Sequence, residues 1–365
     1  MRNKESIAQL LGYFQSQSAE ALNFDQKAIE DTYENINYNQ TIPIKILSII
    51  GGILITMVFI AFLWMFGLWD SKLGLSVLGF VLVLGAILVN KFYDKVILDT
   101  LSISGYVGGF ILIALGLDIG ELFTPLLFIA ICLITMAFTQ NYILSFVNVF
   151  IINASLLALI YFTNSFHIIH LYVSILALLT SFFFLKEAKL ITLTKPLAKL
   201  YAPIRIGLLF SFLGGLIILS QRSYFDVDTI EIAILNTKVF DIRWLSSIVI
   251  ILSVLFFLKH LFKILNIEDI SQKLLVYGFT IVLLAPTAIS PGISGAVLII
   301  LLSFLINYKT GFVIGIAVFI YFISRFYYDL NYTLLTKSIL LFSSGILFLG
   351  FYFYTQKNLN SHEKI

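Results

Sequence analysis

The polar side chains best placed to do chemistry gather near the end of the chain. Arg325 and Asp329 are four positions apart and share one face of a helix. Lys337 begins the next apolar segment and can reach back across the short turn between the two segments. With Tyr328 and Thr333 they form a candidate polar cluster. We predict that this cluster fastens the last two helices at a membrane interface, and the alternative is a substrate or ion site.

Metal binding is the next chemistry that residue types could indicate. His167 and His170 lie three positions apart on one face of a predicted helix. A useful metal site needs a third ligand, which the nearby sequence does not supply. The acidic pair Asp226 and Asp228 likewise lacks the further oxygen ligands that a divalent cation requires. We therefore predict interfacial histidines and no metal site.

Catalytic and cofactor signatures are missing from the sequence. There is no HExxH, no GxSxG and no glycine-rich loop ahead of Lys and Ser or Thr. The single cysteine, Cys132, lies in the middle of an apolar run, where a thiol acts as a small apolar side chain. The sequence predicts no cofactor and does not suggest catalysis.

The elements that position these residues are apolar helices. The chain has 365 residues, of which 60% are hydrophobic and 12% charged, and its mean hydropathy is +1.01. Because a membrane span needs about 20 apolar residues in helical form, the sequence predicts an all-α, polytopic integral membrane protein. We predict about twelve transmembrane helices, near residues 44–66, 73–91, 96–117, 122–139, 141–162, 166–185, 204–220, 243–263, 273–289, 293–307, 310–329 and 335–355.

The ninth and tenth predicted spans, 273–289 and 293–307, are shorter than the others and are joined through Pro286 and Pro291. Two interpretations remain open at this point. Both segments cross the membrane fully, or together they form one broken or re-entrant pair.

Lysine and arginine positions predict the orientation. With the N-terminus inside, eleven of these residues fall in inner loops and six in the tails, which makes seventeen of the 23, against six in outer loops. Both termini are therefore predicted to be cytoplasmic.

Three regions follow from the composition. Residues 1–42 carry charge and two apolar patterns at helical spacing, which predicts a cytoplasmic amphipathic helical segment. Residues 43–355 form the membrane domain, with an outer loop at 221–242 that has the pattern of two extended segments around a turn. Residues 356–365 form a cytoplasmic tail.

A family resemblance rests on motifs at both ends of the membrane domain. The later motifs are Pro291-Gly292, Gly311, Gly315, Tyr327-Tyr328-Asp329-Leu330, Thr333-Leu334-Leu335, Lys337-Ser338 and Gly345. The early ones are Pro43, Lys45 and Gly51-Gly52. In these positions the chain resembles the bacterial inner-membrane family known as domain of unknown function 4401 (DUF4401), from Pro43 to about Tyr354. It departs from the pattern at Ile44, where an aromatic residue commonly follows the first proline.

The resemblance implies a multi-span protein of the bacterial cytoplasmic (inner) membrane with no established activity. Genes of this family often lie beside one for a membrane-anchored protein with a GDYXXLXY motif, and beside one for another uncharacterised polytopic membrane protein. The first function hypothesis is therefore a scaffold or translocation component of an envelope assembly that contains these partners.

The alternative is a secondary transporter of an unknown small solute. Twelve spans, split six and six by the basic segment 186–205, match the layout of major facilitator transporters. However, the basic motif that those transporters carry between their second and third spans is absent, and no buried charge marks a coupling site. An intramembrane enzyme acting on lipids would need a catalytic group within a span, and the sequence offers none.

Overall fold

The computed structural model describes residues 42–92, 96–117, 119–165, 168–221 and 243–329, with separate positions between 335 and 353. Across these residues the chain is helical, with turns and no strand, so the predicted all-α class is confirmed. Seven of the described helices are long and apolar enough to cross a membrane, and four further apolar stretches are shorter: Leu54–Met65, Leu101–Gly116, Phe123–Phe138 and Pro291–Leu305. The count of twelve spans and the orientation stay predictions.

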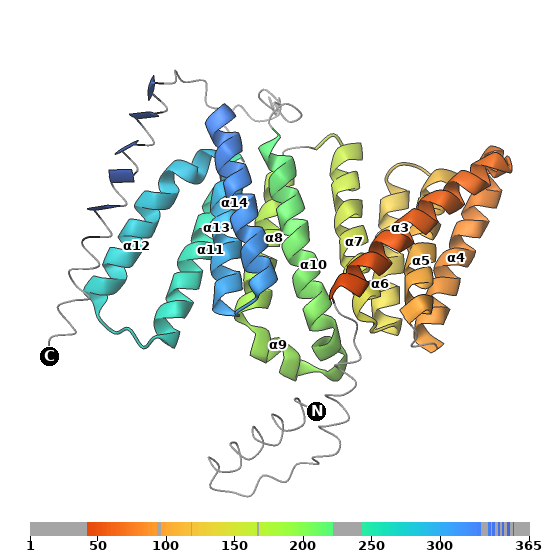
Figure 1. Ribbon diagram of the computed structural model, residues 1–365, viewed down its shortest axis with the longest axis horizontal. Helices are drawn as coiled ribbons and strands as arrows, with labels where there is room; N and C mark the ends of the chain where they lie inside the picture. Colours follow the sequence, from red (N-terminus) through yellow and green to blue (C-terminus); the bar gives the residue numbers. More distant parts are fainter. Residues whose placement is uncertain are drawn as a thin grey trace, which may run out of the picture. The chain divides into compact units, whose positions relative to one another are not determined.

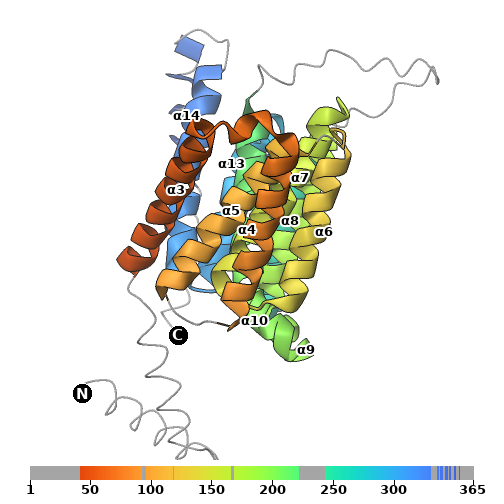
Figure 2. The same ribbon diagram turned by 90° about the vertical axis from the view of Figure 1, so that its right-hand side faces the viewer.

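The chain divides into two compact units, with the boundary between Asp118 and Ile119. The first unit contains α3 (Ile42–Met65), the short 3₁₀ helix η1 (Leu68–Asp70), α4 (Lys72–Phe92) and α5 (Val96–Gly116). Figure 2 shows α4 beside α5, which is the pair with the most extensive contact, and α3 also packs on α5. Leu63, Leu75 and Leu112 form the small apolar core of this unit.

The second unit is a larger bundle whose long helices alternate in direction (Figure 1). Its helices are α6 (Phe123–Phe138), α7 (Tyr142–Phe162), α8 (Ile168–Leu185), α9 (Glu187–Leu193), α10 (Lys195–Ser220), α11 (Arg243–Ile264), α12 (Ile270–Leu284), η3 (Ala285–Ile289), α13 (Pro291–Leu305) and α14 (Lys309–Asp329). Large side chains such as Phe212, Phe257 and Phe322 fill the core between α8, α10, α11, α13 and α14. The short α9 lies across one end of the bundle.

Three helices end in the same type of turn, and in each turn an asparagine adopts the left-handed backbone conformation. Asn164, Asn266 and Asn307 follow α7, α11 and α13 and have φ of 49°, 50° and 54°. In each case the next residue donates its backbone N–H five positions back, as Tyr308 does to Ser303 over 2.8 Å. This left-handed C-terminal cap satisfies a carbonyl that the end of the helix would leave unpaired.

The lysine and arginine positions place the basic segment 186–205 in an inner loop between spans, and the structure corrects this, because most of the segment is helical. The structure has α9 in this segment and begins α10 at Lys195, nine residues before the predicted start of the seventh span. The Thr194 side chain accepts a hydrogen bond from the Leu197 amide over 3.4 Å, and Pro196 occupies the first turn of α10. Hydropathy did not reveal α9 or the first turns of α10, because the lysines there lower the mean hydropathy of the segment below that of a membrane span.

The ninth and tenth predicted spans are two helices that run in opposite directions. Figure 1 shows α12 rising to η3 and α13 returning from it. α12 and most of η3 form a candidate membrane span of 19 residues, Ile270–Ala288. At about 1.5 Å per residue the 15 residues of α13 span roughly 22 Å, so full crossing by α13 stays open.

Several predicted features lie outside the described residues. They are the amphipathic segment up to residue 41, the outer loop from residue 222 to 242 and the tail 356–365. The domain boundaries predicted for them stay predictions.

Candidate functional site

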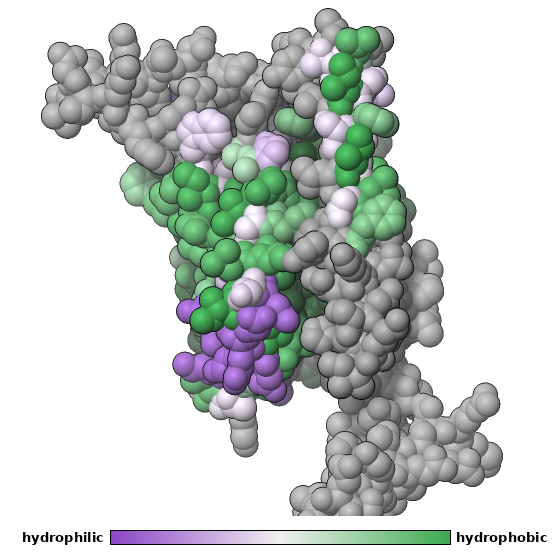
Figure 3. All heavy atoms as spheres, turned by 90° about the vertical axis from the view of Figure 1, so that its left-hand side faces the viewer, coloured by the Kyte–Doolittle hydropathy of each residue, from purple (hydrophilic) through white to green (hydrophobic). Residues whose placement is uncertain are grey.

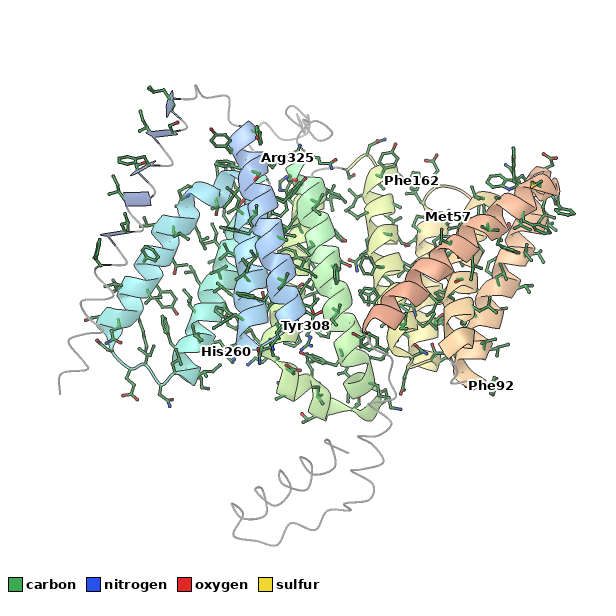
Figure 4. The ribbon with its side chains drawn as sticks, viewed as in Figure 1. Met57, Phe92, Phe162, His260, Tyr308 and Arg325 are labelled. Carbon is green, nitrogen blue, oxygen red and sulfur yellow. The ribbon has the colours of Figure 1, made fainter. Side chains whose placement is uncertain are left out.

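The predicted polar cluster is only partly described. Arg325 lies in the last turns of α14, half-buried, at the end of the bundle opposite α9 (Figure 4). Tyr328 is exposed and its ring meets that of Tyr327 edge-on, with 5.8 Å between the ring centroids. The side chain of Asp329, and Thr333 and Lys337 altogether, lie outside the described residues. The cluster therefore stays a prediction.

His170 connects α8 to α11. Its Nδ1 lies 3.0 Å from Oγ of Ser246, a fully buried serine at the beginning of α11. His167 lies outside the described residues. Among the residues that the structure describes, no group of three or more His, Cys, Asp or Glu side chains could hold a metal ion. The contact that is described for His170 is thus a link between helices.

At the interruption between α12 and α13, side-chain hydroxyls donate hydrogen bonds to two backbone carbonyls. Thr287 donates to the carbonyl of Leu284 over 2.6 Å, and Ser247 from α11 donates to the carbonyl of Ala288 over 2.6 Å. Broken helices can line a polar binding site with such carbonyls. Here these two carbonyls accept hydrogen bonds from the protein itself, so the break ties α11 to η3.

A charged cluster that the sequence did not reveal lies at the α9 end of the bundle. Nη1 of Arg205 lies 3.2 Å from Oε1 of Glu187, and the two side chains are 14% and 34% exposed. The guanidinium lies over the rings of Phe184, Tyr201 and Tyr308, at 5.5, 5.1 and 5.7 Å from their centroids. One arginine therefore contacts α8, α9, its own α10 and the turn between α13 and α14.

The aromatic side chains of this Arg205 cluster are themselves held in place. The Tyr201 hydroxyl donates to the carbonyl of Phe183 over 2.8 Å and accepts a hydrogen bond from Arg205 over 3.4 Å. Burial raises the pKa of Tyr308, and the neighbouring Arg205 charge partly opposes that rise. The Tyr308 hydroxyl is consequently neutral at physiological pH, and its ring remains a partner for the cation.

The Arg205 cluster serves as a clamp: its ion pair and ring contacts hold α9 against the rest of the bundle. Its guanidinium has an acid and three rings as partners, while its buried Nε has no hydrogen-bond partner among the described residues. A cation enclosed in this way holds neighbouring elements together and presents little surface to a ligand. The one sequence signal for it was Tyr201, placed four residues before Arg205 and therefore on the same helix face.

The end that carries α9 is also the polar end. Figure 3 shows a hydrophobic band over the described part of one face, with hydrophilic residues gathered below it where α11 gives way to α12. Lys186 and Lys189 at α9, and Lys259 and Lys263 at the end of α11, are exposed. These lysines are among those on which the predicted orientation rests, and the orientation itself stays a prediction.

A lateral cavity of about 550 Å³ lies between α6, α7, α8 and α10. Its walls are almost entirely aliphatic. Within them, the Tyr172 hydroxyl donates to Oδ1 of Asn153 over 3.0 Å, and Nδ2 of Asn153 donates to the carbonyl of Val149 over 2.7 Å. No sequence motif marked this cavity, because its lining comes from four helices at ordinary apolar positions.

Comparison with known proteins identifies the family. Residues 41–357 match the family model described as Domain of unknown function (DUF4401). No curated protein and no solved structure matches the chain. The match covers most of the chain and agrees with the motifs at its two ends, so the protein belongs to the DUF4401 family.

Proposed function

We propose that this protein is a scaffold or translocation component of an envelope assembly in the bacterial cytoplasmic membrane. Its expected partners are a membrane-anchored GDYXXLXY-type protein and another polytopic membrane protein, which are the neighbours that the family resemblance implies. The single observation that supports this role best is the exposed helix α12.

Helix α12 is membrane-length together with η3, but it buries little of itself against the chain. Leu284 is its one fully buried residue. On the inner side its described ring contact is between Tyr277 and Phe262 of α11, with 5.3 Å between centroids. Figure 1 shows α12 beside α11, with the separate described positions between 335 and 353 drawn on its other side. A helix in this position has most of its surface available to lipid or to another helix.

The exposed side of α12 has the pattern of a helix contact. Ile270, Leu274, Gly278 and Ile281 are exposed and recur at helical spacing, which places them on one stripe. A Cβ built at Gly278 meets no atom within 4 Å. Small residues in such a stripe let the backbone of a second helix approach closely. The occupant we propose is the transmembrane anchor of the GDYXXLXY-type partner.

Gly278 allows a test that leaves the chain's own packing alone. In a Gly278→Leu substitution the new Cβ meets no atom of the chain within 4 Å, and leucine is the better helix former by about 0.5–1 kcal/mol. We expect the variant to fold normally and to lose the partner. The measurement is tagged purification from native membranes in mild detergent, followed by mass spectrometry of the proteins that are retained.

The matched control is Ala317→Leu, which enlarges another exposed small residue on α14. We expect this variant to retain the partner at the level of the original protein. Retention of the partner by Gly278→Leu would place the contact elsewhere and remove the support from α12.

The alternative function is a secondary transporter of an unknown small solute. Absence of any membrane-anchored partner from the original protein, together with solute flux after reconstitution into liposomes, would favour that alternative. Flux would then have to survive Gly278→Leu, since this residue faces away from the rest of the chain.

A further inference from the structure

The lateral cavity between α6, α7, α8 and α10 points to a ligand that the proposed scaffold role does not include. Its lining runs along α7 from Val149 to Thr163, and along α8 from Ile168 to Leu179. At about 1.5 Å per residue the stretch of α7 is roughly 21 Å long. This exceeds one leaflet of a hydrocarbon core that is about 30 Å thick. The cavity is therefore long and follows the axis of the membrane helices.

The walls offer an occupant contact with hydrocarbon. The lining polar residues Asn153 and Tyr172 bond each other, and Thr163 donates to the carbonyl of Leu159 over 2.8 Å. Their polar groups thus have partners within the protein. An apolar cavity of this kind stays dry and takes up apolar molecules, because water would find too few hydrogen-bond partners in it.

The mouth of the cavity opens where the helices face lipid. Leu133, Leu156 and Ile175 line the cavity and are also exposed on the surface of the bundle. In a bilayer these side chains contact hydrocarbon, so an acyl chain enters without displacing water. The bound acyl chain is stabilised by dispersion contacts with the groove, which an unfilled groove would lack.

The width of the cavity selects a chain over a helix. Even the whole space between the lining atoms, about 1270 Å³ over roughly 21 Å, gives a mean cross-section of only about 60 Å², whereas a helix about 10 Å across needs about 80 Å². A transmembrane helix of a partner, or of a second copy, is therefore too wide. A single hydrocarbon chain is the apolar object of the right shape.

We infer that this cavity is a binding site for one acyl chain of a membrane phospholipid. The chain enters from the side, through the mouth at Leu133, Leu156 and Ile175, and lies along the groove past Asn153. The bound lipid fills the groove between α7 and α8 and so becomes part of the packed unit.

The test is photolabelling in lipid nanodiscs that contain a phosphatidylethanolamine with a diazirine at the end of one acyl chain. We expect the label on peptides from α7 and α8 that line the cavity, and one retained phospholipid for each protein in native mass spectrometry. Ile175→Trp places an indole in the mouth and should abolish both signals. Leu156→Trp, from the opposite wall, should do the same.

Leu178→Trp is the control, since Leu178 lies on the same helix and is 53% exposed, close to the 48% of Ile175, but does not line the cavity. It should leave label and retained lipid unchanged. Equal labelling of the Ile175 and Leu178 variants, or labelling spread evenly over exposed helices, would mean boundary lipid only and would overturn the inference. Crosslinks from Cys introduced at residue 175 to a protein segment would overturn it in favour of a helix. Unchanged thermal unfolding of each variant shows that the fold is intact.

Discussion

Glycine does different work in the two units. In the first unit the glycines at the contact of α4 with α5 meet backbone as well as side chains: a Cβ at Gly79 would lie 2.8 Å from the carbonyl oxygen of Gly109, and one at Gly109 would lie 2.8 Å from that of Gly79. A Cβ at Gly116 would come within 2.6 Å of the Lys72 carbonyl oxygen. The backbones of α4 and α5 are therefore in contact along their length, as small residues permit in membrane helix pairs.

In the second unit glycine faces side chains. A Cβ at Gly292 would lie 2.6 Å from the Phe322 ring, and one at Gly207 would lie 2.8 Å from Cβ of Val149. Gly295 receives Leu216 in the same way. Gly292 and Gly295 each form a notch for one large side chain, and Gly207 meets the smaller side chain of Val149.

The two kinds of glycine contact differ in whether the neighbouring atoms can move aside. A backbone contact cannot yield without displacing a whole helix, whereas a side chain in a notch can change rotamer. The first unit is thus specified by helix separation, and the second by the fit of individual side chains. Two substitutions test this distinction, and a third tests a polar contact within the first unit.

The largest effect is expected for Gly79→Ala, because the new Cβ would meet the Gly109 carbonyl and the Ile113 amide nitrogen. We expect a loss of about 3 kcal/mol in the free energy of unfolding, measured by titration with a denaturing detergent. Gly85→Ala is the control on the same helix, where a Cβ meets no atom within 4 Å, and should be neutral or slightly stabilising. Equal stability of the two variants would refute backbone contact between α4 and α5.

An intermediate effect is expected for Gly295→Ala, since the obstacle is the end of the flexible Leu216 side chain. We expect a loss of about 1–2 kcal/mol. In the double variant Gly295→Ala with Leu216→Ala the obstacle is gone, so the alanine at 295 should cost nothing further. The same double-mutant cycle has no counterpart at Gly79. If the two alanines prove additive, the notch description is wrong.

The smallest effect is expected for Thr56→Val, which tests the polar contact between α3 and α5. The Thr56 hydroxyl lies 2.9 Å from the Gly52 carbonyl oxygen of its own helix and 3.1 Å from that of Ser104 on α5. Removing a hydrogen bond between membrane helices costs about 0.6 kcal/mol on average. A loss well above that, in the same detergent titration, would show that α3 depends on this contact more than on its apolar surface.

Hydropathy predicted the long helices well because length and apolarity are set by the bilayer. The fifth span was predicted at 141–162 and α7 is found at Tyr142–Phe162, where Asn141 caps its beginning by accepting from the Ile143 amide. The same criterion missed α9, whose lysines and short length give no span signal.

The clamp and the cavity could not be predicted in the same way. Arg205, Glu187 and Tyr308 belong to separate elements, and their meeting depends on how α9 and the turn after α13 pack. The cavity is shaped by the spacing of four helices, which apolar periodicity does not encode. The clearest polar pattern in the sequence, from Arg325 to Lys337, lies partly beyond the described residues, so it remains a prediction.

The asparagine turns after α7, α11 and α13 indicate which substitutions this sequence can tolerate. Glycine adopts their left-handed backbone at least as readily, so Asn164, Asn266 and Asn307 can be exchanged for glycine at little cost. The reverse exchange at Gly79 or Gly109 would drive a side chain into a neighbouring helix. Asparagine and glycine should therefore replace each other freely at the turns of this protein. A glycine that asparagine cannot replace should instead mark a place where two helix backbones are in contact.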